Sequence, residues 1–136
     1  MLRRNLTMYQ LEGIIRYYHN WCMAWLVEDD LLAYYSALLP KALYVQPPMR
    51  AAHVSIVRLF EEVPDRSQWG KYEGQSIVVD YEPGVQSNGL YFWLDCFSDE
   101  VGFLRRSLGL STFREHDGFS DYGCYHITIG NVKNVQ

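Results

Sequence analysis

The chain has 136 residues, of which 49% are hydrophobic and 21% are charged, as in an ordinary globular protein. Its net charge is −4, and no cluster of Lys and Arg is longer than the pairs Arg3-Arg4 and Arg105-Arg106. This charge disfavours a protein that coats duplex DNA or long RNA, because phosphate neutralisation supplies most of that affinity. A small ligand with few phosphates remains compatible with it.

The chain shows no membrane or export signal. No apolar run approaches the roughly 18 residues of a membrane span, and the first five residues lack the apolar stretch of a secretory leader. We therefore expect no membrane partner and a cytoplasmic protein, or one of the host cytoplasm if the protein is viral. The odd number of cysteines (Cys22, Cys96 and Cys124) favours reduced thiols.

No metal or cofactor is expected. The cysteines do not have the spacing of a zinc ligand set, and Asp95, Asp99, Glu115 and Asp117 form no ligand-spaced cluster.

The first half of the chain predicts a strand, a helix and a second strand. Residues 11–18 are compatible with a strand or a short helix, and residues 21–28 read as a buried strand. Asp30 is placed to cap an amphipathic helix that ends at Pro40. Residues 52–58 then form the next predicted strand.

The second half predicts the same order. Residues 74–81 and 89–97 read as two strands that pair in a hairpin. Ser98 caps a helix that stops at Gly109, with acidic residues in its first turn and arginines in its last. A strand at 125–131 follows a polar loop.

These two halves suggest an internal duplication. We expect one α+β domain, residues 1–136, built from duplicated β-α-β units. The units form two lobes, at about 21–58 and 74–131, related by a pseudo-twofold axis with a central cleft between them.

A short pattern, histidine followed by an aliphatic residue and a hydroxyl residue, occurs at 53–55 and again at 126–128, each time inside a predicted strand. Alternate side chains of a strand point to the same face. Each strand therefore presents an imidazole and a hydroxyl to one face and its aliphatic residues to the core. Two such strands side by side predict a site with two histidines and two hydroxyls.

These four groups can catalyse phosphodiester cleavage without a metal. One of His53 and His126 acts as the base and the other as the acid, since imidazole takes both forms near neutral pH. Ser55 and Thr128 donate hydrogen bonds to the non-bridging oxygens, whose charge grows in the transition state. Which histidine is the acid stays open from the sequence.

Four segments carry a resemblance to a known family: Ala52–Arg58, Trp69–Gly74, Asn88–Asp95 and His126–Gly130. The chain resembles the two-histidine phosphoesterase superfamily, which has an RNA-ligase-like fold, and within it the segments are similar to phage anti-CBASS phosphodiesterases. The resemblance implies cleavage of 3′-5′ bonds in the cyclic di- and trinucleotide messengers of bacterial antiviral immunity. Eight residues of the sequence follow Thr128, so we expect no C-terminal lid over the substrate.

Five further residues are candidates for substrate binding. Arg58 and Lys133 flank the motifs and are placed to meet phosphate, although solvated charges at strand ends explain them equally well. Trp69, Lys71 and Tyr72 lie in a predicted loop that can close over the cleft and stack a base, although Trp69 is as compatible with the core.

Other functions remain open. The same chemistry suits the 2′,3′-cyclic ends of RNA or 2′-5′ linked oligoadenylate. A non-catalytic nucleotide sponge or a protein-binding module on the same fold is a third hypothesis. The expected partner is a small cyclic oligonucleotide rather than a duplex nucleic acid, and the oligomeric state stays open.

Overall fold

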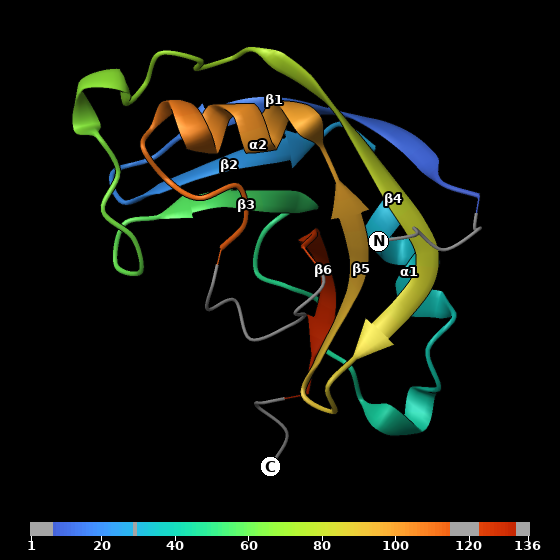
Figure 1. The fold of residues 1–136 in the computed structure, drawn as a ribbon. Coiled ribbons are helices and arrows are strands. Elements are labelled where there is room, and N and C mark those ends of the chain that lie inside the picture. Colours follow the sequence, from blue (N-terminus) through green and yellow to red (C-terminus); the bar gives the residue numbers. More distant parts are fainter. Residues whose placement is uncertain (1–6, 29, 115–122, 133–136) are drawn as a thin grey trace.

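The computed structural model describes residues 7–28, 30–114 and 123–132, and its six strands close into an antiparallel barrel (Figure 1). The strands are β1 (Tyr9–Tyr17), β2 (Trp21–Leu26), β3 (His53–Arg58), β4 (Ser76–Ser87), β5 (Tyr91–Phe97) and β6 (Tyr125–Asn131). Around the barrel their order is β1-β2-β3-β6-β5-β4. The described residues also form two α-helices and two short 3-10 turns. The helices are α1 (Leu31–Ala37) and α2 (Asp99–Ser107), and the turns are Lys41–Leu43 and Arg66–Gln68.

The prediction of an α+β fold with duplicated β-α-β units in two lobes is wrong. Every neighbouring pair of strands is antiparallel, whereas a β-α-β unit has parallel strands. The strand that the prediction left open, as a strand or a short helix at residues 11–18, is β1. It pairs with β2 on one side and β4 on the other, so that Gly13 lies opposite both Leu26 and Ile77. Because β1 joins the two halves at one seam and β3 joins β6 at the other, one closed barrel results.

The individual elements follow the local sequence more closely. The predicted strands at 21–28, 52–58, 89–97 and 125–131 are confirmed as β2, β3, β5 and β6, and the predicted hairpin is confirmed as β4 with β5. The Ser98 cap is also confirmed, since its hydroxyl accepts a hydrogen bond from the backbone N–H of α2. Asp30 precedes α1 without a capping bond from its side chain.

Aliphatic side chains at every second strand position fill the barrel. Examples with no exposed surface are Val54, Ile56, Leu94, Ile127 and Ile129. Burying each such side chain contributes about 1.5–3 kcal/mol relative to leaving it exposed. The inward face of every strand is therefore committed to the core, and the polar side chains between them lie on the outer face.

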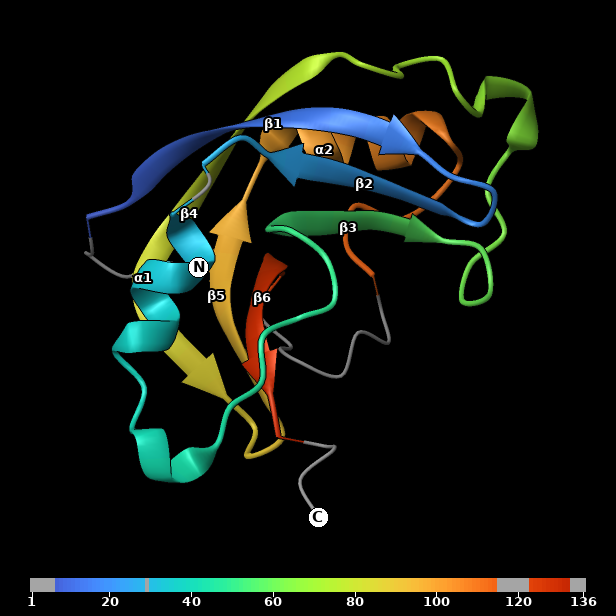
Figure 2. The same cartoon turned by 180° about the vertical axis from the view of Figure 1, so that it is seen from behind.

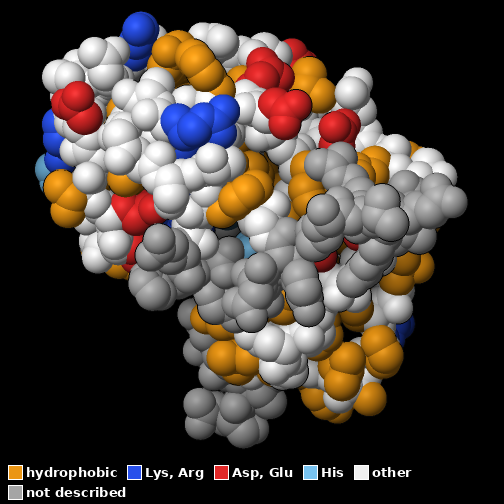
Figure 3. Space-filling model, viewed as in Figure 1, with side chains coloured by type: hydrophobic (Ala, Val, Ile, Leu, Met, Phe, Trp, Pro, Cys, Tyr) orange, Lys and Arg blue, Asp and Glu red, His pale blue; other side chains and the backbone are white. Residues whose placement is uncertain are grey.

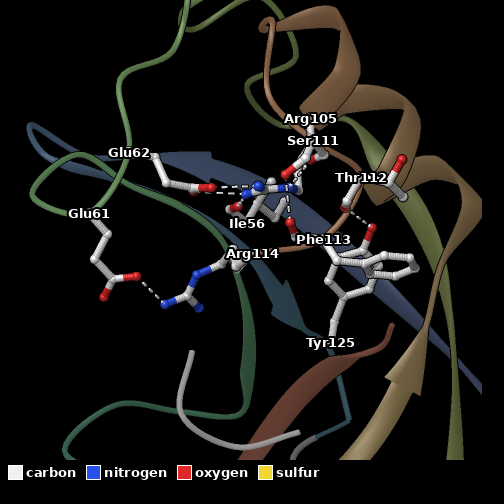
Figure 4. Close-up of polar contacts among 9 residues, drawn as sticks. All are labelled: Ile56, Glu61, Glu62, Arg105, Ser111, Thr112, Phe113, Arg114 and Tyr125. Carbon is white, nitrogen blue, oxygen red and sulfur yellow. Dashed lines mark hydrogen bonds and ion pairs between the residues drawn. The ribbon is translucent and has the colours of Figure 1, made fainter. Parts of the chain in front are cut away.

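A buried ion pair fixes the loop after β3 against α2. The side chain of Arg105 is fully buried and bonds the Glu62 carboxylate through Nη1 and Nη2, at 2.8 and 2.5 Å (Figure 4). Its Nη1 also donates to the Ile56 carbonyl at 2.6 Å, and its Nε donates to the Ser111 carbonyl at 2.8 Å. The guanidinium of Arg105 thus connects β3, the loop after β3 and the segment after α2 through hydrogen bonds.

The surface carries charged side chains of both signs on the upper part of the face in Figure 3, and hydrophobic side chains gather at its lower edge. The described residues include no helix with both the length and the apolar character that a bilayer span requires.

Removing the carboxylate of Glu62 should destabilise the protein by about 3–5 kcal/mol, because it leaves the Arg105 guanidinium buried without its counter-charge. We expect Glu62→Ala to lower the free energy of unfolding in urea by that amount. The exposed Glu28 supplies the control, and Glu28→Ala should change the free energy by no more than about 0.5 kcal/mol. Equal stabilities of the two variants would contradict the anchoring role of the pair.

Candidate active site

The two motif strands are neighbours in the barrel. β3 and β6 pair with Val54 opposite Ile127, and both side chains are fully buried. Residues on either side of this pair are half-buried, so the predicted alternation is confirmed. Both imidazoles and both hydroxyls therefore lie on the outer face. Figures 1 and 2 show that the two strands lie at a steep angle to one another, and they pair at this one position.

A cavity of about 560 Å³ lies over this face and is lined by His53, Ser55, His126 and Thr128. Its volume is in the range of ordinary small-molecule sites, about 300–1,000 Å³. The structure thus brings together all four residues that the sequence predicted as catalytic. The loop at 46–50 contributes further to the wall.

The ring of His53 has a defined tautomer. Its Nδ1 lies 2.8 Å from the Ala51 carbonyl, which can only accept, so Nδ1 carries the hydrogen and Nε2 of the neutral ring carries the lone pair. Burial lowers the pKa of His53 below its ordinary value of 6.5, and the charges of Arg58 and Arg50 lower it further, against the opposing effect of the Ala51 bond. These neighbours favour the neutral imidazole at pH 7.

The hydroxyl of Ser55 is held from two sides. Its oxygen accepts hydrogen bonds from Trp21 Nε1 at 3.1 Å and from Arg58 Nη2 at 3.2 Å. Both bonds use the oxygen as acceptor, which leaves the O–H of Ser55 as a donor toward the cavity. The ring of Trp21 also packs edge-on against His53, with centroids 5.0 Å apart.

An acidic side chain lies close to His126. Asp95 lies directly opposite His126 on β5, and its Oδ1 is 4.0 Å from His126 Nε2. The same oxygen accepts a hydrogen bond from Trp93 Nε1 at 2.9 Å, which orients the carboxylate. A nearby negative charge favours the protonated form of an imidazole, and the described charges next to His53, those of Arg50 and Arg58, are positive.

Three arginines, Arg50, Arg58 and Arg114, line the cavity of a protein whose net charge is −4. Arg114 lies beside Glu61, with Nη2 2.5 Å from its carboxylate (Figure 4). Its Nε is buried and has no hydrogen-bond partner within the described residues. Arg114 thus adds positive charge to the cavity wall, although its Nε is itself closed to solvent.

Among the residues predicted to bind substrate, Arg58 lines the cavity. Trp69 packs against Tyr17 with centroids 5.0 Å apart, and Lys71 lies over the ring of Tyr72; none of Trp69, Lys71 and Tyr72 lines this cavity. Lys133 lies outside the described residues.

The sequence reasoning missed several residues of the cavity wall, namely Trp21, Arg50, Tyr91 and Arg114. Trp21 lies on β2, which pairs with β3, and the pairing of two strands cannot be read from either strand alone. Arg50 and Arg114 lie in loops, where periodicity carries no information about which way a side chain points.

Three side chains could together hold a metal ion. Asp95, Cys124 and His126 converge beside the cavity, although they are not a ligand pattern along the chain.

Comparison with known proteins finds no matching family model, no matching curated protein and no matching solved structure.

Replacing Arg58 with Met should raise the pKa of His53, because a positive charge that disfavours the imidazolium is removed. The measurement is an NMR titration of the His53 ring. Arg16→Met is the matched control, since Arg16 pairs with Glu73 and does not line the cavity. A His53 titration that is the same in both variants would contradict the electrostatic coupling.

Proposed function

We propose that the protein is a metal-independent phosphodiesterase that cleaves 3′-5′ bonds of cyclic di- and trinucleotides. The observation that carries this proposal is the convergence of two imidazoles and two hydroxyls, from β3 and β6, on one cavity. Cleavage of such messengers would silence the immune signal that they carry. The mechanism below follows from the surroundings of each group.

His53 is the general base. The hydrogen on its Nδ1 is bound by the Ala51 carbonyl, so the lone pair on Nε2 is the one available. Burial and two arginines lower the pKa of His53 and keep the ring neutral at pH 7. The base removes the proton from the 2′-hydroxyl of the substrate, whose oxygen then attacks the neighbouring phosphorus.

His126 is the general acid. The carboxylate of Asp95 favours its protonated form, and the imidazolium donates its proton to the leaving 5′ oxygen. The bond to that oxygen breaks as the bond from the 2′ oxygen forms, which leaves a 2′,3′-cyclic phosphate. In a second step with the two roles exchanged, His126 deprotonates a water molecule that attacks the cyclic phosphate, and His53 protonates the 2′ oxygen that leaves.

The remaining polar groups act on the phosphate. Ser55 and Thr128 donate to the non-bridging oxygens, and Arg58 and Arg114 offset the charge that develops on them. Trp21 lines the same cavity and carries Arg50 over its ring, with the guanidinium carbon 5.0 Å from the ring centroid, which holds this positive charge beside the site. A protein that only binds nucleotides has no need of two histidines in opposite electrostatic surroundings, which favours an enzyme over a sponge.

Loss of either histidine should abolish most of the activity. In EDTA, we expect the protein to hydrolyse at least one of a panel of cyclic di- and trinucleotides, and His53→Ala or His126→Ala to slow turnover by about 10²–10⁴-fold. Product chromatography is the measurement. His19→Ala is the matched control, because His19 is exposed and does not line the cavity.

The same panel separates the alternatives. Turnover of only 2′,3′-cyclic AMP or 2′-5′ oligoadenylate would replace the substrate while keeping the chemistry. Binding with no product peak would leave a nucleotide sponge. Full turnover by either histidine variant would refute the mechanism.

Arg114 should contribute to phosphate affinity. Losing a hydrogen bond to a charged group costs about 1.5–3 kcal/mol, so we expect Arg114→Met to weaken binding of the preferred cyclic nucleotide by about 10- to 100-fold, measured by calorimetry with His53→Ala protein to prevent turnover. Arg66→Met is the control, since Arg66 lies over Trp69 and outside the cavity. Equal losses in both variants would assign the effect to overall charge.

A further inference from the structure

A carboxylate, a thiol and an imidazole meet beside the cavity. Cys124 Sγ lies 3.5 Å from Asp95 Oδ1 and 3.8 Å from His126 Nε2, and these two atoms are 4.0 Å apart. All three side chains are largely buried. We propose that Asp95, Cys124 and His126 bind one thiophilic divalent cation of the zinc class.

The spacing of the three atoms fits such an ion. A point equidistant from them lies about 2.2 Å from each, and zinc binds sulfur, nitrogen and oxygen at about 2.0–2.3 Å. Cys124 and His126 also line the cavity, so an ion held by the three has a side open to it. Three protein ligands with one open position are typical of zinc sites that exchange a ligand with solvent.

The scaffold holds the three side chains in place. Asp95 and His126 are directly opposite one another on β5 and β6, and Cys124 shares a face with His126, two residues before it. Trp93 Nε1 donates to Asp95 Oδ1 at 2.9 Å. A carboxylate oxygen has more than one lone pair, so it can accept this bond and bind a metal at once. Such outer bonds orient metal ligands.

The charges also fit. A carboxylate and a thiolate carry two negative charges, which balance a divalent cation, while the imidazole binds as a neutral ligand. Binding replaces the Cys124 thiol hydrogen, which leaves as a proton. The charge set and the soft sulfur favour zinc or cobalt over magnesium or calcium, which prefer oxygen.

The arrangement is not a nucleophile triad. In such a triad the two nitrogens of the histidine contact different partners. Here Cys124 Sγ and Asp95 Oδ1 both approach Nε2 of His126. Convergence on one lone pair suits a shared ion better than proton transfer between the two groups.

A bound ion would occupy the Nε2 lone pair of His126 and withdraw this ring from acid catalysis. We therefore expect zinc to inhibit the hydrolysis; this consequence rests on the proposed function, whereas the site itself does not.

Cobalt titration tests the site directly. Protein freed of metal with EDTA, dialysed and kept reduced with a phosphine, should bind one Co²⁺ per chain with sulfur-to-cobalt charge-transfer absorption and the visible bands of tetrahedral cobalt, and Zn²⁺ should displace it. Cys124→Ser should lose the charge-transfer band. Asp95→Asn, which can keep the bond from Trp93, should weaken Co²⁺ binding at least about tenfold.

Cys22→Ala is the matched control, because it removes a buried thiol from β2 and should keep the band. Circular dichroism of each variant establishes that it is folded. No charge-transfer band in the unmodified chain, or an undiminished band in folded Cys124→Ser, would overturn the site.

The hydrolysis assay tests the effect of the ion. Zinc at a concentration that saturates the site should lower turnover at least about tenfold, since it removes the acid. Each variant is compared with its own rate in EDTA, and the zinc effect should disappear in Cys124→Ser. Stimulation by zinc would overturn the inhibitory role. An absence of hydrolysis under every condition would count against the proposed function and leave the cobalt result standing.

Discussion

The contact between β3 and β6 is the constraint on which the site depends. It is made at Val54 and Ile127, whose side chains are packed into the barrel without exposed surface. Because successive side chains of a strand point to opposite faces, the residues next to Val54 and Ile127 must then point to the outer face. Core packing and site assembly are therefore the same event, because a one-residue slip of either strand would bury the imidazoles and expose the aliphatic residues.

The two motifs are alike in sequence but not in surroundings. His53 has Ala51 two residues before it and Trp25 opposite it on β2, and neither side chain can bear a charge. His126 has Cys124 two residues before it and Asp95 opposite it on β5. Two histidines in like motifs therefore have different neighbours, and the proposed roles of base and acid rest on this difference.

The local elements could be predicted from the sequence because their signals are local. Alternation of apolar residues marks β3 and β6, and Ser98 marks the start of α2. The closed barrel could not be predicted, since it depends on β1, whose apolar pattern fits a strand or a helix equally well and whose two partners are distant in the chain.

The same distinction separates the site residues that were found from those that were missed. His53, Ser55, His126 and Thr128 were found because alternate side chains of a single strand share a face. Asp95 was set aside because the acidic residues around it form no ligand-spaced cluster along the chain, yet the register of β5 with β6 places it directly opposite His126. Arg114 lies in a loop, and Trp69 has a signal that suits a core as well as a base. Pairing register is a property of two strands together, and reading each strand alone omits it.

The acidic surroundings of His126 have two consequences that compete. A carboxylate beside an imidazole favours its protonated form, which is the form a general acid needs. The same carboxylate and the nearby thiol of Cys124 also form the donor set of a soft divalent ion, which binds the ring only when it has lost that proton. A proton and a metal ion therefore compete for Nε2 of His126. Since Ala51 and Trp25 provide no ligand beside His53, this competition is confined to His126 and does not reach His53.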